Sequence, residues 1–175
     1  IISSGLREII EGTAIAKDFT HIYASSFYYN EHGEPCWPAQ VINYTNKTQF
    51  LFRIEKGILD INDNAVNDHF AEGELRVPFR NIVYIGDSAT DIPCMRLVNS
   101  LGGHSVGVYD LENAASKDTV CRMIRDERIR YYVPADYTKG SEMDILIHRI
   151  IDKTAAYEVL EEKHLRDRKE AMAKY

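Results

Sequence analysis

The sequence has few cysteines and no long hydrophobic run. Its three cysteines, Cys36, Cys94 and Cys121, are an odd number without a regular spacing, which predicts reduced thiols rather than a disulfide framework. No apolar stretch approaches the roughly 18 residues that a membrane-spanning helix requires. The first residues also lack the pattern of a signal peptide. We therefore expect a cytoplasmic protein that has no membrane partner.

Positive charge is also scarce. The 175 residues include 21 lysines and arginines against 27 acidic residues, for a formal net charge of -6. The most basic stretch, residues 164–174, is interleaved with acidic residues and therefore predicts a solvated helix face. Without a basic stripe, we expect no nucleic-acid partner. The hydrophobic fraction of 45% is sufficient for the core of one ordinary domain.

Apolar stretches alternate with helical patterns along the chain. Strands are expected at residues 1–3, 20–25, 41–44, 81–86, 104–109 and 130–133, and helices at residues 6–10, 47–56, 92–99, 113–125 and from 141 onward. This alternation predicts an α/β fold with a mostly parallel sheet. The continuous apolar run at residues 81–86 is typical of a central strand that is buried on both faces.

The expected organisation is one core with two additions and a C-terminal helix. We assign residues 1–155 to the core, residues 26–44 to a β-hairpin flap, residues 58–78 to a loop insertion, and residues 156–175 to the C-terminal helix. Gly33 is placed where a hairpin turn requires it, and Pro35 and Pro38 keep their segment at a sheet edge. Gly57 is well placed to end the helix that opens near Lys47.

Polar residues follow the expected strand ends, where ligands bind in open α/β sheets. Asp87 comes directly after the run 81–86, and Asp91 follows four residues later. Asp87 is a candidate Mg²⁺ ligand, because Mg²⁺ prefers carboxylates combined with phosphate and water. Asp91 would either ligate the metal directly or orient Lys47 through a charge-assisted hydrogen bond. Lys47 would place a compact positive charge on a phosphate oxygen.

The first expected strand ends in Ser4 and Gly5. The Ser4 hydroxyl and the backbone N–H of Gly5 or Leu6 would donate to phosphate oxygens at a helix N-terminus. Each of these residues also has a purely structural interpretation: Ser4, Asp87 and Asp91 are common helix caps, and a single lysine is usually a surface residue. The two carboxylates together, after a buried strand and Gly86, favour a site.

At these positions the sequence resembles the haloacid dehalogenase superfamily, in particular its phosphoserine phosphatase-like branch. Ile1-Ile2-Ser3-Ser4-Gly5 is similar to the second family motif, Lys47 to the third-motif lysine, and Gly86-Asp87-x-x-x-Asp91 to the fourth motif. The adjacent glycine favours Ser4 over Ser3 as the phosphate-binding hydroxyl. Lys47 is preferred to Lys56 because it opens a helix near the expected site. The resemblance covers roughly residues 1–110.

The resemblance implies a Rossmannoid three-layer fold and a Mg²⁺-dependent phosphatase that acts on a small phosphorylated metabolite. It implies catalytic roles for Lys47, Asp87 and Asp91, substrate binding by Ser4, Gly5 and Lys47, and metal binding by Asp87 and Asp91. In this family an aspartate attacks the phosphomonoester, and water hydrolyses the aspartyl-phosphate.

The family's first motif, Asp-x-Asp at the end of the first strand, has no counterpart in this sequence. We therefore expect a missing N-terminal segment that completes the site, and a chain that is inactive by itself. In the family the strand of the first motif lies between those of the second and fourth motifs. The strands at residues 1–3 and 81–86 should therefore lie roughly 10 Å apart without a ladder between them.

Two alternatives remain open. One is a non-catalytic module that retains the phosphate-binding groups without the nucleophile. The other is the phosphorylation domain of a cation-transporting ATPase, whose fourth motif is followed by a proline, as Asp91 is by Pro93 here. Thr90 in place of the asparagine of that motif, and the lack of a following membrane helix, argue against the transporter.

Overall fold

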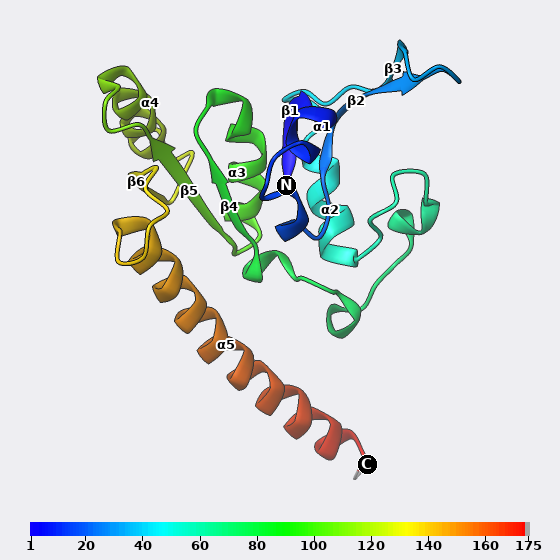
Figure 1. Ribbon diagram of the computed structural model, residues 1–175. Helices are drawn as coiled ribbons and strands as arrows, with labels where there is room; N and C mark the ends of the chain where they lie inside the picture. The colour runs from blue at the N-terminus through cyan, green and yellow to red at the C-terminus, as the bar shows by residue number, and fades with distance from the viewer. Residues whose placement is uncertain (174–175) are drawn as a thin grey trace.

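The chain folds as two three-stranded sheets with helices packed against them. The computed structural model describes residues 1–173 (Figure 1). In one sheet, β1 (Ile2–Leu6) pairs in parallel with β2 (Tyr23–Tyr29), which pairs in antiparallel orientation with β3 (Pro35–Gln40). In the other, β4 (Val83–Gly86), β5 (His104–Tyr109) and β6 (Tyr131–Pro134) are all parallel, with β5 in the centre. The expected α/β class with a parallel sheet is confirmed.

Five α-helices connect and flank these strands. They are α1 (Arg7–Glu11), α2 (Thr48–Lys56), α3 (Ile92–Ser100), α4 (Ala114–Arg125) and α5 (Glu142–Met172). Helix α2 ends at Gly57, whose φ of 76° is readily adopted only by glycine. The Asn113 and Ser141 side chains cap the amino ends of α4 and α5. Helix α5 is continuous, so the expected boundary at residue 155 lies within it. Among residues 1–173, no helix is both long and apolar enough to cross a membrane.

Several expected elements differ from the structure near the N-terminus. Strand β1 extends to Leu6, so Ser4 and Gly5 lie within the strand instead of after it. Helix α1 has no buried residue, and the Ile9 side chain is 68% exposed. The hairpin turn around Gly33 is confirmed, but its second strand is β3, and the strand expected at residues 41–44 is absent.

Both sheets pack against helix α2, but no hydrogen-bonded ladder joins them. Neighbouring residues of α2 join different clusters: Leu51 packs with Tyr84 and the α3 side chains, whereas Phe50 packs with Tyr23 of β2. Ile2 of β1 packs against both clusters. Among the described strands, β1 pairs only with β2, and β4 pairs only with β5. The expectation that β1 and β4 form no direct ladder is therefore confirmed.

Strand β4 is consequently an edge strand in the part of the chain that the structure describes. The prediction of a central strand buried on both faces was wrong here, since Ile85 is 40% exposed. The central position belongs to β5, whose six residues are all buried. Residues 81–86 are therefore more apolar than an edge strand with a single strand neighbour needs to be.

The shared core gives a prediction for folding stability. Met95 of α3 is fully buried at 0% exposure. Met95→Ala should lower the free energy of unfolding by about 2–5 kcal/mol, because it removes buried methylenes and leaves a cavity. Ile9→Ala, at an exposed position, should change it by less than about 0.5 kcal/mol. Urea denaturation followed by circular dichroism measures both, and equal effects would contradict this assignment of the core.

Candidate functional site

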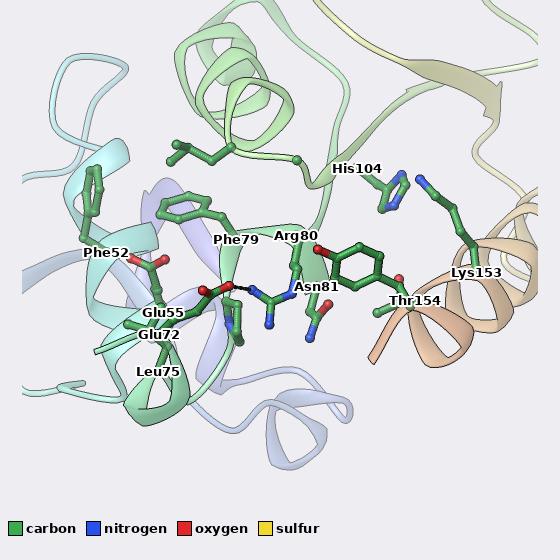
Figure 2. A pocket seen from close by; sticks show the side chains of 14 residues that line it. Phe52, Glu55, Glu72, Leu75, Phe79, Arg80, Asn81, His104, Lys153 and Thr154 are labelled. Carbon is green, nitrogen blue, oxygen red and sulfur yellow. Dashed lines mark hydrogen bonds and ion pairs between the residues drawn. The ribbon is translucent and has the colours of Figure 1, made fainter. Parts of the chain in front are cut away.

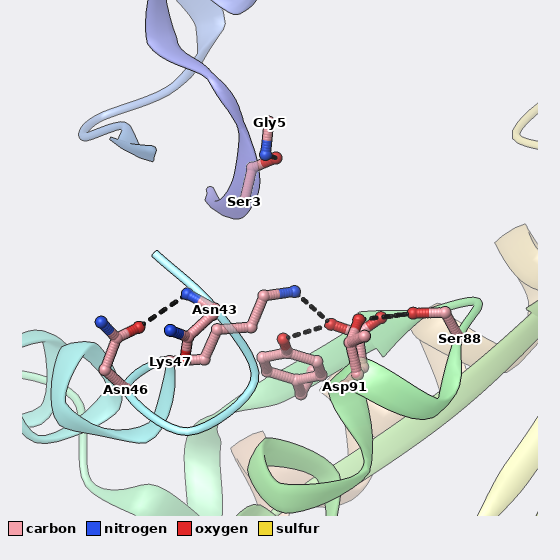
Figure 3. A network of polar contacts seen from close by, with 9 residues as sticks. Ser3, Gly5, Asn43, Asn46, Lys47, Ser88 and Asp91 are labelled. Atoms are coloured by element: carbon pink, nitrogen blue, oxygen red, sulfur yellow. Dashed lines mark hydrogen bonds and ion pairs between the residues drawn. The ribbon is translucent and has the colours of Figure 1, made fainter. Parts of the chain in front are cut away.

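A buried ion pair joins α2 to the turn after β4. The Nζ atom of Lys47 lies 2.7 Å from Oδ1 of Asp91 (Figure 3). Lys47 directly precedes α2, and Asp91 directly precedes α3. Their residues are only 5% and 6% exposed. Two residues that are 44 positions apart are thus brought into one site, as the sequence motifs indicate.

Three donors engage the Asp91 carboxylate. In addition to Lys47, the Tyr84 hydroxyl donates to Oδ1 at 2.9 Å, and the Ser88 hydroxyl donates to Oδ2 at 3.2 Å. Burial, together with the nearby Asp91 charge, raises the pKa of Tyr84, so its hydroxyl remains a neutral donor. Of the two roles expected for Asp91, this geometry favours orientation of Lys47 over direct metal ligation.

Tyr84 is a site residue that the sequence reasoning missed. It lies inside the apolar strand β4, where an aromatic residue is usually assigned to the core, and its side chain does belong to the main hydrophobic cluster. The hydroxyl group of Tyr84 could have indicated this role, because the hydroxyl of a buried tyrosine usually has a hydrogen-bond partner. Asp91, seven residues away, is that partner.

Gly86 has a steric role. A Cβ atom at this position would lie 2.8 Å from Cβ, the carboxyl carbon and Oδ2 of Asp91. Glycine is therefore required because Asp91 packs directly against the backbone at the end of β4. The φ of Gly86 is not in the left-handed region, so the close packing of Asp91, and not a turn conformation, accounts for the glycine.

Asp87 differs from Asp91 in its surroundings. It is exposed, and its carboxylate makes no hydrogen bond or ion pair with residues 1–173. It lines a cavity of about 350 Å³ beyond the carboxyl ends of β4 and β5, together with Asp110, Ser116 and Tyr137. The sequence reasoning did not single out these three residues. The oxygens of Asp87 are thus free for a metal, whereas those of Asp91 are engaged.

Within β1, the donors expected to bind phosphate have different partners. The Gly5 N–H donates to Oγ of Ser3 at 3.0 Å, so it is already used within the strand. Ser4 is exposed, and its carbonyl accepts from the Ser25 hydroxyl at 3.2 Å. The first helix begins at Arg7 and has only five residues, so it does not present the expected N–H groups at Gly5. Figure 3 shows Ser3 and Gly5 on the segment that faces the Lys47–Asp91 pair.

Lys56, the other lysine weighed for the site, has a structural role. Its Nζ atom donates to the carbonyls of Val66 and Asp68, both at 2.7 Å. It also lies 5.1 Å from the centre of the Phe70 ring. Lys56 therefore fastens the connection between α2 and β4, while Lys47 reaches the carboxylate at the strand end.

Asp87 could supply one ligand to a Mg²⁺ ion, but residues 1–173 do not provide a full set of metal ligands. Among residues 1–173, no three His, Cys, Asp or Glu side chains lie close enough together to hold a metal. Mg²⁺ is usually bound through one or two carboxylates, with phosphate and water as the other ligands. Asp87 fits that pattern as a single carboxylate ligand.

Comparisons with known proteins identify one curated relative. An uncharacterized protein of Borreliella burgdorferi is 24% identical over 157 residues, which cover 82% of this chain and 53% of that protein. The chain thus spans about half the length of the relative that it matches. No family model and no solved structure matches the chain.

The buried ion pair predicts strong coupling between its two residues. Lys47→Met should lower the free energy of unfolding by about 3–5 kcal/mol, because it leaves Asp91 buried without its counter-charge. Asp91→Leu should have an effect of similar size. The double variant should be destabilised by clearly less than the sum of the two, since no unpaired charge remains buried. Denaturant unfolding of the four proteins measures the coupling, and strictly additive effects would disprove it.

Proposed function

We propose that this chain forms the phosphate-binding part of a Mg²⁺-dependent phosphomonoester hydrolase of the haloacid dehalogenase type. One observation carries the proposal: the buried Lys47–Asp91 pair lies at the strand end that also presents the free carboxylate of Asp87. The substrate class is a small phosphorylated metabolite.

Lys47 is the group that would bind the phosphate. Its ammonium carries three N–H donors, and Asp91 accepts one of them at 2.7 Å. The other two donors make no hydrogen bond with residues 1–173 and would bind phosphate oxygens in the proposal. Tyr84 and Ser88 hold Asp91 in place, so the direction of the Lys47 amino group is set before a ligand arrives. Such positioning and charge neutralisation are most of what phosphoryl transfer requires of a protein.

Asp87 would hold the metal ion. Its exposed carboxylate directly follows β4 and is therefore carried by a rigid element. When bound, Mg²⁺ supplies neutralisation of the charge repulsion between phosphate and an anionic nucleophile. The β1 hydroxyls of Ser3 and Ser4 are further candidates for phosphate oxygens, although Ser3 now accepts a bond from Gly5.

The nucleophile would come from a strand between β1 and β4. These strands run in the same direction in Figure 1, and a groove of about 380 Å³ separates them. The groove is lined by Ile1 and Ile2 on one side, residues 83–85 on the other, and Leu51 and Ile54 of α2. A strand in this groove would form hydrogen bonds with both edges and join the two sheets. In the proposal, a segment that precedes this chain in a longer protein supplies that strand and its aspartate.

A non-catalytic phosphate-binding module is the second candidate. It is favoured by the observation that Asp87 is exposed and Lys47 keeps two N–H donors without a partner among residues 1–173, in a sequence that has no motif-one aspartate pair. The two candidates share the phosphate site and differ in turnover.

Hydrolysis of para-nitrophenyl phosphate by the longer protein that contains this chain distinguishes the candidates. We expect Mg²⁺-dependent turnover that chelation abolishes. Asp87→Asn should lower kcat/KM by about a hundredfold or more, because the metal loses its carboxylate ligand. Asp118→Asn, at an exposed position of α4, is the matched control and should have no effect. The 175-residue chain alone should show no turnover. Phosphate binding by the longer protein without hydrolysis would favour the binding module instead.

The groove between β1 and β4 gives a separate prediction. In the 175-residue chain, Ile85→Lys should change the free energy of unfolding by less than about 0.5 kcal/mol, because Ile85 is 40% exposed. In the longer protein the same change should destabilise by about 2 kcal/mol or more, because an inserted strand would bury the lysine. Chemical denaturation of both proteins measures this difference. Equal, small effects in the two proteins would show that the groove stays open.

A further inference from the structure

A large cavity lies at the opposite end of the β4–β6 sheet from Asp87. It has a volume of about 790 Å³ (Figure 2). Four separate parts of the chain form it: α2, the connection that leads to β4, the start of β5, and α5. This volume is in the range of small-molecule sites in proteins. The cavity shares no lining residue with the Lys47–Asp91 site.

Aromatic side chains form two facing walls of this cavity. Phe52 of α2 and Phe79 lie with ring centres 5.3 Å apart and their planes at 70° on one side. Lys153 and Thr154 of α5 lie on the other side in Figure 2, and Tyr157 of the same helix also lines the cavity. Phe52 and Tyr157 are 39% and 46% exposed, so much of their apolar surface still faces solvent. A planar apolar molecule between these walls would remove that surface from water.

Arg80 holds the walls together. Its guanidinium donates to Glu158 of α5 at 2.8 and 3.4 Å and to Glu72 at 2.7 Å. It also lies 5.6 Å from the centre of the Tyr157 ring. Two carboxylates thus already neutralise Arg80. Its role in the cavity is to fix α5 against the connection before β4.

A second cation of the cavity has no such partner. Lys153 lies one helical turn before Tyr157 and makes no hydrogen bond or ion pair with residues 1–173. In Figure 2 its amino group points toward His104, which is buried at 2% exposure. Burial first, and then the charges of Lys153 and Arg130, lower the pKa of His104. The imidazole therefore stays neutral, and the positive charge of this corner belongs to Lys153.

We propose that this cavity binds a small aromatic carboxylate. The ring would lie between Phe79 and Tyr157, and the carboxylate would pair with Lys153. The cavity supplies a hydrophobic slot and one unpaired cation at its edge, and this ligand class complements both. Because the cavity lies at the amino ends of β4 and β5, the proposal is independent of the phosphatase activity proposed for the other end.

Indole-3-acetate and its neutral analogue indole-3-acetamide test the proposal on the 175-residue chain. Calorimetry should give a dissociation constant below about 1 mM for the acetate and at least about tenfold weaker binding of the amide. Amide-resonance shifts in NMR spectra should concentrate at Phe79, His104 and Tyr157. Absence of saturable binding, equal binding of the two probes, or shifts confined to other surfaces would overturn the proposal.

Two lysine variants test whether Lys153 is the cation that pairs with the carboxylate of the ligand. Lys153→Gln should weaken acetate binding about tenfold and leave amide binding unchanged. Lys139→Gln, on the exposed loop before α5, is the matched control and should change neither. A Lys153 variant that binds the acetate as well as the unaltered chain does would overturn the charge assignment. The comparison of the two probes on the unaltered chain stands even if a variant folds poorly.

Discussion

The contact between Lys47 and Asp91 is the interaction on which the rest of the candidate site depends. It brings a cation from the start of α2 to a carboxylate from the turn after β4, in surroundings that exclude most water. A buried ion pair adds little net stability, since desolvation offsets much of the attraction. Its value here is geometric, because it fixes the start of α2 against the turn that leads from β4 to α3. Tyr84, Ser88 and the space left by Gly86 all serve the same carboxylate.

The parts of the fold that depend on local patterns could be read from the sequence. Strand β5 was expected at its observed residues, and Gly33 and Gly57 have the positive φ that their positions imply. The contact between Lys47 and Asp91 was one of two roles expected for Asp91, because both residues were placed near the strand ends where ligands bind in α/β sheets. The strand expected at residues 41–44 failed for a local reason. Side chains of Asn43 and Asn46 bond to nearby backbone there, and such bonds compete with strand formation.

Other features could not be predicted because they depend on neighbours in space. A tyrosine in an apolar strand is normally counted as core, and only the folded position of Asp91 shows the second role of Tyr84. The apolar run of β4 indicated a central strand that is buried on both faces, yet a central position requires a strand on each side, and β4 pairs only with β5 among residues 1–173. The cavity near α5 could not be predicted from the sequence either, because its lining residues come from four distant parts of the chain.

The open edges of β1 and β4 have a consequence for how the chain behaves in solution. Each edge presents backbone N–H and C=O groups without a strand partner among residues 1–173, next to exposed apolar side chains such as Ile85. Edges of this kind are templates for pairing with other chains, and charged residues or prolines usually protect them. Residues 83–86 of β4 contain neither. Self-association through these edges should therefore become more pronounced as the concentration of the isolated chain rises, and a strand held in the groove would suppress it.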